Sequence, residues 1–199
     1  MDTEVKSNWW LSEDGVIYVN KVLDEMQNES DRSAAILLGA ELDDTLGQIL
    51  EKHLLPPRDK KDRGAIGKTF YVRIELTSRL GLVHPLFHRE LHLIKDVRNE
   101  FAHKTLGITF DDMKVQVITS KLVFPRACDL FIHALAAAQP EMASLLNHNS
   151  RDRFIFSGAI LLHQLNSILE QVSQVEISPL AWINPKMTTV HGLDATHHP

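Results

Sequence analysis

The sequence contains almost no cysteine: Cys128 is the only one among 199 residues. An intrachain disulfide therefore cannot form, and zinc sites built from several thiolates are excluded. A chain with so few thiols fits a reducing compartment, so we expect a cytoplasmic protein.

Long apolar runs are also missing. No stretch approaches the roughly 18 consecutive apolar residues that a membrane-spanning helix needs. The first ten residues, MDTEVKSNWW, lack the basic start and the apolar centre of a secretion signal. Both absences favour the cytoplasm and predict a protein without a membrane partner.

An excess of positive charge is absent too. The net charge of -5 argues against a protein that grips duplex nucleic acid through a broad basic face, because phosphate neutralisation dominates that affinity. Apolar residues make up 44% of the chain and charged residues 24%, as in ordinary globular proteins. The length suits one domain with a sizeable core.

Apolar residues recur at helical spacing along most of the chain. The strongest pattern runs from Asp31 to Leu54 and is ended by Pro56 and Pro57. Further helices are predicted over residues 12–28, 69–80, 84–103, 125–138 and 151–172. We therefore predict an all-α, single-domain bundle of about six helices at residues 12–175, with a tail at 1–11 and an irregular or disordered tail at 176–199.

Several boundary signals support these helices. Ser12 and Thr69 can cap helix starts, Gly81 can end a helix, and Pro85 suits a first helical turn.

Two segments lack helical periodicity. Residues 56–68 predict a solvated surface loop, and residues 104–118, with Val115, Val117 and Ile118, predict a β-leaning loop with a small extended piece.

A polar cluster stands in the closing turns of the 84–103 helix, where the sequence reads DVRNEFAHK. Its members are Arg98, Asn99, Glu100 and His103. In one interpretation the cluster is architectural: His103 complements the negative end of the helix dipole, and Arg98 pairs with Glu41 or Asp44 of the neighbouring helix. This interpretation predicts that the 31–54 helix packs against the cluster.

In the other interpretation the cluster is a metal-independent ribonuclease site. His103 would move protons during attack by a ribose 2′-hydroxyl, and Arg98 would stabilise charge on the phosphorus oxygens. Asn99 would orient the side chain of either His103 or Arg98. RNEFAH resembles the R-x4-6-H motif of HEPN domains. These all-helical modules include toxin and antiphage ribonucleases that act as dimers with the motif at the shared interface.

A longer resemblance points elsewhere. The blocks DRSAAILLGAELDDTLGQIL, GAIGKTFYVRIELTSRLGLV, RELHLIKDVRNEFAH and ITFDD occur in this order and are similar to the mannitol operon repressor family of helical bacterial regulators. They span about residues 30–115, and the last helix also corresponds. The family often has a G-P-L-G-type turn where this chain has GAIG at 64–67, which keeps both glycines.

The family resemblance implies a bundle that modulates transcription of sugar-uptake operons. We find no helix-turn-helix with an exposed recognition helix in the sequence. The expected partner is therefore a protein of the transcription or sugar-uptake machinery. The regulator interpretation also allows a homodimer. No cofactor is expected. The alternative is the HEPN-type ribonuclease, whose partner would be RNA.

Three histidines follow each other at intervals of four residues: His84, His88 and His92. This spacing can present two or three imidazoles to a transition metal. However, Arg89 flanks them, and Glu90 is the only nearby carboxylate along the chain. We expect an exposed helix face here and no metal site.

Overall fold

The structure is a computed structural model that describes residues 13–56, 67–104, 107–124 and 149–176. Within these ranges the chain forms six helices and no strands, which confirms the all-α prediction. The helices are α1 (Glu13–Gln27), α2 (Asp31–His53), α3 (Phe70–Arg79), α4 (Pro85–His103), α5 (Met113–Thr119) and α8 (Ser150–Gln171).

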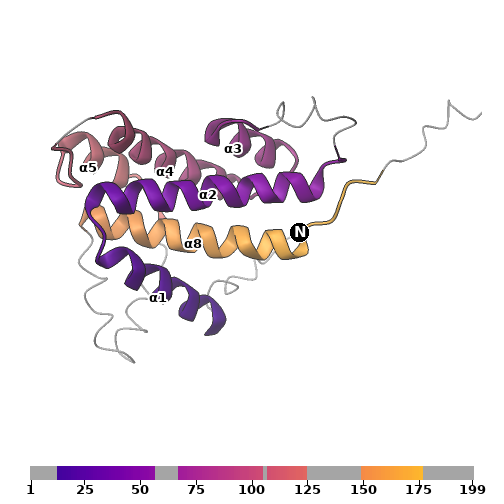
Figure 1. Cartoon of the computed structure of the whole chain (residues 1–199), viewed down its shortest axis with the longest axis horizontal. Coiled ribbons are helices and arrows are strands. Elements are labelled where there is room, and N and C mark those ends of the chain that lie inside the picture. Colours follow the sequence, from indigo (N-terminus) through magenta and orange to yellow (C-terminus); the bar gives the residue numbers. More distant parts are fainter. Residues whose placement is uncertain (1–12, 57–66, 105–106, 125–148, 177–199) are drawn as a thin grey trace, which may run out of the picture.

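Helices α2 and α8 lie side by side at the centre of the molecule (Figure 1). The two helices run parallel: Arg151 at the start of α8 forms an ion pair with Asp31 at the start of α2. Just beyond the end of α8, the amide of Val175 donates to the carbonyl of His53, 2.7 Å away. Gly158 lets the two helices approach, since a Cβ there would overlap the side chain of Leu38.

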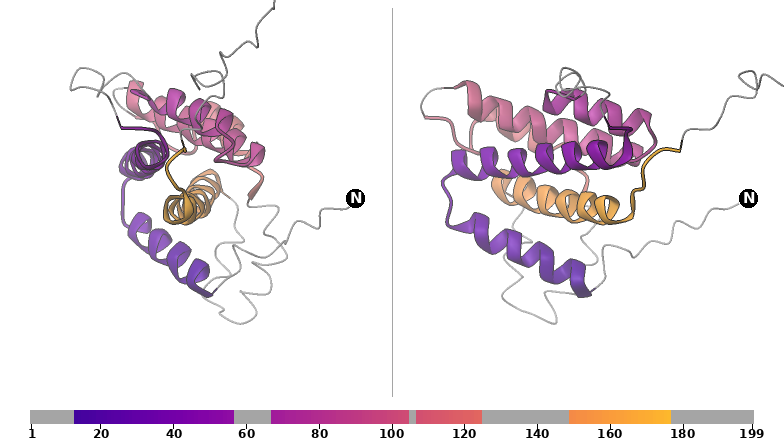
Figure 2. Two further views of the ribbon diagram at one scale, coloured as in Figure 1. Left: turned by 90° about the vertical axis from the view of Figure 1, so that its right-hand side faces the viewer. Right: turned by 45° about the vertical axis from the view of Figure 1, so that its right-hand side comes forward.

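The remaining helices cover this central pair from two sides (Figures 1 and 2). Helix α1 packs on α8, where Asn166 donates a 2.8 Å hydrogen bond to the hydroxyl of Tyr18. Helices α3 and α4 pack on α2, and the short α5 packs on α4 and α8. The 31–54 helix therefore does contact the helix that carries RNEFAH, as predicted.

The predicted helix boundaries agree closely with the observed ones. Thr69 accepts a hydrogen bond from the amide of Val72 at the start of α3, and Gly81 adopts a φ of 70° just after that helix. Pro85 stands in the first turn of α4, and His84 caps it. These local signals were sufficient because Thr69 and His84 accept amides of the first turn, and Pro85 has no N–H that would be left unpaired there.

The predicted β-leaning loop at residues 104–118 is wrong in its second half, because Met113–Thr119 is helical. Val115 and Thr119 lie one turn apart on α5, and both are fully buried. Burial of this face against α4 and α8 outweighs the local preference of β-branched residues for strands.

Several predictions fall outside the described residues. They are the cap at Ser12, the tail at 1–11, most of the 56–68 loop, the 125–138 helix and the tail from 177 onward. Among the helices that are described, none has the length and apolar character needed to cross a membrane.

Candidate functional site

Helix α4 carries two separate polar clusters. Its buried face includes Leu91, Ile94, Val97 and Phe101, which have no solvent exposure and hold the helix in the core. His88 and His92 lie in its first half, and the RNEFAH residues lie in its last two turns. His92 and Arg98, the nearest members of the two clusters, are six residues apart, a rise of about 9 Å, so the two clusters occupy different turns of the helix.

Arg98 lies at the contact between α4 and α2. Its side chain runs along Gly39, where an added Cβ would come within 2.7 Å of Arg98 Cγ. The guanidinium Nη1 donates to Asn99 Oδ1 at 3.2 Å, and the buried Nε has no hydrogen-bond partner among the described residues. Asn99 is thus the residue that contacts the Arg98 guanidinium by a hydrogen bond.

The predicted ion pair between Arg98 and Glu41 or Asp44 is wrong. Among the described residues, no carboxylate lies within ion-pair distance of Arg98. Glu41 and Asp44 are exposed, and Asp44 instead accepts a 2.7 Å hydrogen bond from Gln48. The reason is helical geometry: residues two and five positions after Gly39 lie on other faces of α2.

Asp43 is the acidic residue that shares the face of Gly39, four positions further along α2. Its carboxylate pairs with Arg73 of α3 at 2.9 Å, and the same Arg73 nitrogen also donates to the Asp43 carbonyl. Arg73 additionally donates to the carbonyl of Gly67 at 2.7 Å. The acidic group of α2 thus anchors α3, and it does not neutralise the RNEFAH turn.

The end of α4 is held by other contacts. Glu100 pairs with Lys114 of α5 at 2.6 Å. Arg32 of α2 donates to the carbonyls of Phe101 and Lys104. Carbonyls at the end of a helix have no partner within the helix itself, so Arg32 supplies the missing donor. These contacts make the RNEFAH turn a joint between α2, α4 and α5.

His103 is the last residue of α4 and is exposed. In the described structure no contact joins it to Arg98 or Asn99. The imidazole of His103 and the guanidinium of Arg98 therefore lie on the same two turns of α4 without a hydrogen bond between them in the described part of the chain.

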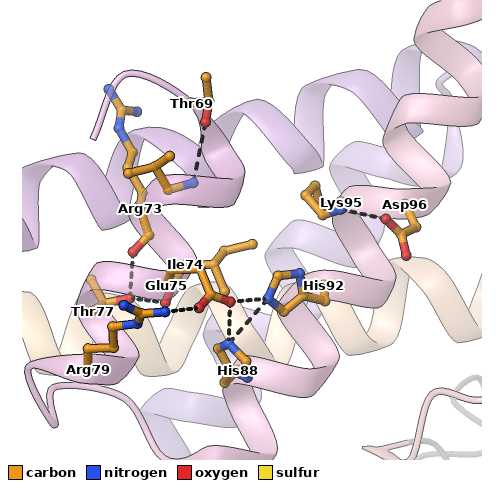
Figure 3. Close-up of polar contacts among 11 residues, drawn as sticks. Thr69, Arg73, Ile74, Glu75, Thr77, Arg79, His88, His92, Lys95 and Asp96 are labelled. Carbon is orange, nitrogen blue, oxygen red and sulfur yellow. Dashed lines mark hydrogen bonds and ion pairs between the residues drawn. The ribbon is translucent and has the colours of Figure 1, made fainter. Parts of the chain in front are cut away.

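The second cluster joins α3 to α4 (Figure 3). Glu75 of α3 points between two histidines of α4, and its Oε1 lies 2.9 Å from His88 Nε2 and 3.1 Å from His92 Nε2. The two Nε2 atoms are 3.2 Å apart. Three potential ligand atoms thus meet at one point, and each belongs to a side chain that is 23–31% exposed.

Charge and aromatic groups surround this cluster. Arg79 reaches the other carboxylate oxygen, Oε2, at 3.6 Å, and the ring of Tyr71 lies against His92 with centroids 5.5 Å apart. The pKa of Glu75 lies below its usual range, because His88 and then His92 donate hydrogen bonds to the carboxylate. Glu75 therefore remains negatively charged throughout the neutral pH range.

The structure corrects the expectation of a simple exposed face with no useful carboxylate. His84 is not part of the cluster, since its Nδ1 accepts the amide of Leu86 and caps α4. Glu90 is fully buried and instead accepts the amide of Val123 at 3.1 and 3.2 Å. The sequence analysis did not include Glu75 in the cluster because Glu75 lies on another helix, α3. The usable signal was the presence of a glutamate on the helix that precedes two histidines spaced four residues apart.

Comparison of the chain with models of known families, with curated proteins and with solved structures found no match. The resemblances to the mannitol operon repressor and HEPN families therefore rest on the sequence blocks quoted above.

Proposed function

We propose that the protein is a mannitol-repressor-like transcriptional regulator that acts by binding another protein and has no DNA-reading motif of its own. The sequence blocks that resemble the repressor family support this, because α2, α3, α4 and the segment before α5 contain them and pack into one unit. The expected partner is a component of the transcription or sugar-uptake machinery.

The observation that carries the proposal is the structural use of the RNEFAH turn. Arg32 caps the end of α4, and Glu100 binds Lys114, so polar residues of this turn hold helices together. Arg98 is packed against Gly39, and among the described residues its guanidinium hydrogen-bonds only to Asn99. A turn that is built into the helix packing suits a binding module better than a catalytic centre.

The test is transcription from a mannitol-uptake promoter in cells that contain or lack the protein. The proposal predicts lower promoter activity in the presence of the chain, and no binding of the purified chain to the promoter DNA by itself. Equal promoter activity with and without the protein would refute the regulatory role. Tight, sequence-specific binding of the purified chain to the promoter would refute the protein-mediated mode of action.

A second candidate is the HEPN-type ribonuclease, and one observation favours it. Arg98 is held by Asn99 and is not neutralised by any carboxylate of the described residues, so its charge remains available for a phosphate. The HEPN resemblance implies that His103 and Arg98 act together at a dimer interface, and within the described residues of one chain no hydrogen bond joins the two. In that arrangement His103 acts as the proton-transfer group.

The ribonuclease candidate predicts cleavage of single-stranded RNA by the purified chain in the presence of a metal chelator. His103→Ala should abolish the cleavage and leave the unfolding free energy within about 1 kcal/mol of wild type, because His103 is exposed. Absence of cleavage at concentrations that support a dimer would eliminate this candidate.

A further inference from the structure

We propose that Glu75, His88 and His92 form a binding site for one divalent transition-metal ion, with Zn²⁺ as the best match. The site connects α3 to α4 and lies on the first half of α4, where His92 is about 9 Å along the helix axis from Arg98, the first residue of the RNEFAH turn. It is independent of the regulatory function proposed above, because neither its residues nor its chemistry enter that proposal.

The spacing of the three atoms is close to that of a metal-ligand set. Glu75 Oε1 and the two Nε2 atoms are separated by 2.9, 3.1 and 3.2 Å. A tetrahedral ion with bonds of about 2.0–2.1 Å holds its ligand atoms about 3.3 Å apart. An ion about 1 Å out of the plane of these atoms would reach all three with only small side-chain adjustments.

Protons alone satisfy this triangle of contacts poorly. Each imidazole Nε2 presents either one N–H or one lone pair in its ring plane. If both nitrogens are protonated, both bond to Glu75 but their N–H groups face each other across 3.2 Å. If one nitrogen is unprotonated, its lone pair faces the carboxylate oxygen of Glu75. A cation at the common focus would satisfy all three atoms at once.

The ligand types select the class of metal. Two imidazoles and one carboxylate suit Zn²⁺ and its neighbours Co²⁺ and Ni²⁺, whereas Ca²⁺ and Mg²⁺ require sets of oxygen ligands. Three protein ligands leave a fourth position for water or an anion. The partial exposure of all three side chains gives the ion a path from solvent.

The nearby cations do not close the site. Arg89, next to His88 in sequence, points to the carbonyl of Lys121 at 3.4 Å. Lys95 is bound to Asp96 at 2.5 Å (Figure 3). Arg79 is the only one of these cations on Glu75, where it pairs with Oε2 and leaves Oε1 to the histidines. Its side chain is 79% exposed, so an incoming ion can displace it at little cost.

The experiment is a titration of the full chain with Co²⁺, followed by visible absorption and then by competition with Zn²⁺. Wild type should bind one Co²⁺ with the intense absorption of a tetrahedral ion, and Zn²⁺ should displace it. Glu75→Gln and His92→Ala should each weaken Co²⁺ binding by more than about 10-fold, since even partners outside the first ligand shell act on that scale. His103→Ala, an exposed histidine elsewhere on α4, is the matched control and should bind like wild type.

Absence of the tetrahedral spectrum in wild type would overturn the proposal. Wild-type affinity in both Glu75→Gln and His92→Ala would also overturn it, because the ion would then occupy other histidines. Circular dichroism of the metal-free variants verifies the fold. If either variant unfolds, His92→Gln decides: it removes the imidazole ligand and keeps a polar side chain, so it should weaken Co²⁺ binding by more than about 10-fold, and an unchanged affinity would contradict the site.

Discussion

Arg98 shows how a charged residue can serve a helix interface without an ion pair. Its aliphatic stem fills the space above Gly39, while its buried Nε has no acceptor. Long basic side chains often stabilise through such packing as much as through charge. The stem and the charge of Arg98 should therefore make contributions of opposite sign to stability.

We predict that Arg98→Ala lowers the free energy of unfolding by about 1–2 kcal/mol, because it removes the packing of the stem. Arg98→Met keeps a similar stem and removes the unsatisfied donor, so it should leave the unfolding free energy unchanged or raise it by up to about 1 kcal/mol. Urea denaturation of the two variants measures both effects. Equal losses in Ala and Met would mean that the charge itself stabilises the fold.

Glu90 is the other informative single residue on α4. It is fully buried, and burial raises the pKa of its carboxyl, although hydrogen bonds from the amides of Val123 and Phe124 partly counter this effect. Glu90→Ala would leave those amides without an acceptor and should lower the unfolding free energy by about 1–3 kcal/mol. Glu90→Gln keeps one acceptor oxygen and should lose less. If Glu90→Gln and Glu90→Ala were equally destabilised, the hydrogen bonds would not be the cause.

Two glycines determine how closely the long helices approach. Gly39 admits Arg98 of α4 to the surface of α2, and Gly158 of α8 admits Leu38 of α2. A glycine inside a helix normally costs up to about 1 kcal/mol relative to alanine. These two positions accept that cost in exchange for close packing.

We predict that Gly39→Ala lowers the unfolding free energy by about 1–3 kcal/mol, although alanine is the better helix former. The added Cβ would lie 3.0 Å from Arg98 Cβ, which cannot rotate away because it is fixed to the backbone of α4. In an Arg98→Ala background the closest contact, to Cγ, is absent, so the loss should shrink. A double-mutant cycle measures this coupling, and additive losses would argue against the contact.

The long helices were predictable from the sequence, and α5 was not. Apolar periodicity defined α2, α4 and α8, and caps such as Thr69 located their neighbours. Helix α5 has only seven residues, several of them β-branched, so its local preference favoured an extended chain. Its helical form depends on burial of Val115 and Thr119, which no local pattern reveals.

In the candidate sites, too, features that are local in sequence were predictable, and contacts between helices were not. The RNEFAH motif was located correctly because it is continuous in sequence, whereas its contacts were not predicted. The residues that bind this turn, Arg32 and Lys114, lie on other helices. Likewise, His88 and His92 were visible as a pair, but Glu75 joins them only through the crossing of α3 and α4.

One ion pair links several segments of the whole molecule. Asp31 at the start of α2 binds Arg151 at the start of α8 and accepts the amide of Phe110 at 3.0 Å. Arg151 also donates to the carbonyls of Met26 and Glu29 at 2.8 and 2.6 Å. The end of α1, the starts of α2 and α8 and the segment before α5 therefore meet at this pair.

We predict that Arg151→Ala lowers the unfolding free energy by about 1–3 kcal/mol, because it removes the ion-pair partner of Asp31 and one donor to each of the Met26 and Glu29 carbonyls. Arg89→Ala is the matched control: Arg89 is exposed, and among the described residues it makes a 3.4 Å hydrogen bond to Lys121 and attracts the Glu90 carboxylate, so its loss should change stability by less than about 0.5 kcal/mol. Chemical denaturation of both variants makes the comparison. A similar small effect in both would show that the Asp31–Arg151 pair does not hold the bundle together.

We propose that the RNEFAH turn is a structural joint and that the protein acts by binding, without cutting RNA. The decisive measurement is the half-life of the mannitol-uptake transcript after transcription is stopped, in cells with wild type, with His103→Ala or without the protein. We predict the same half-life in all three, together with equal repression by wild type and His103→Ala. A half-life that wild type shortens and His103→Ala restores would refute this proposal and identify the turn as a ribonuclease site.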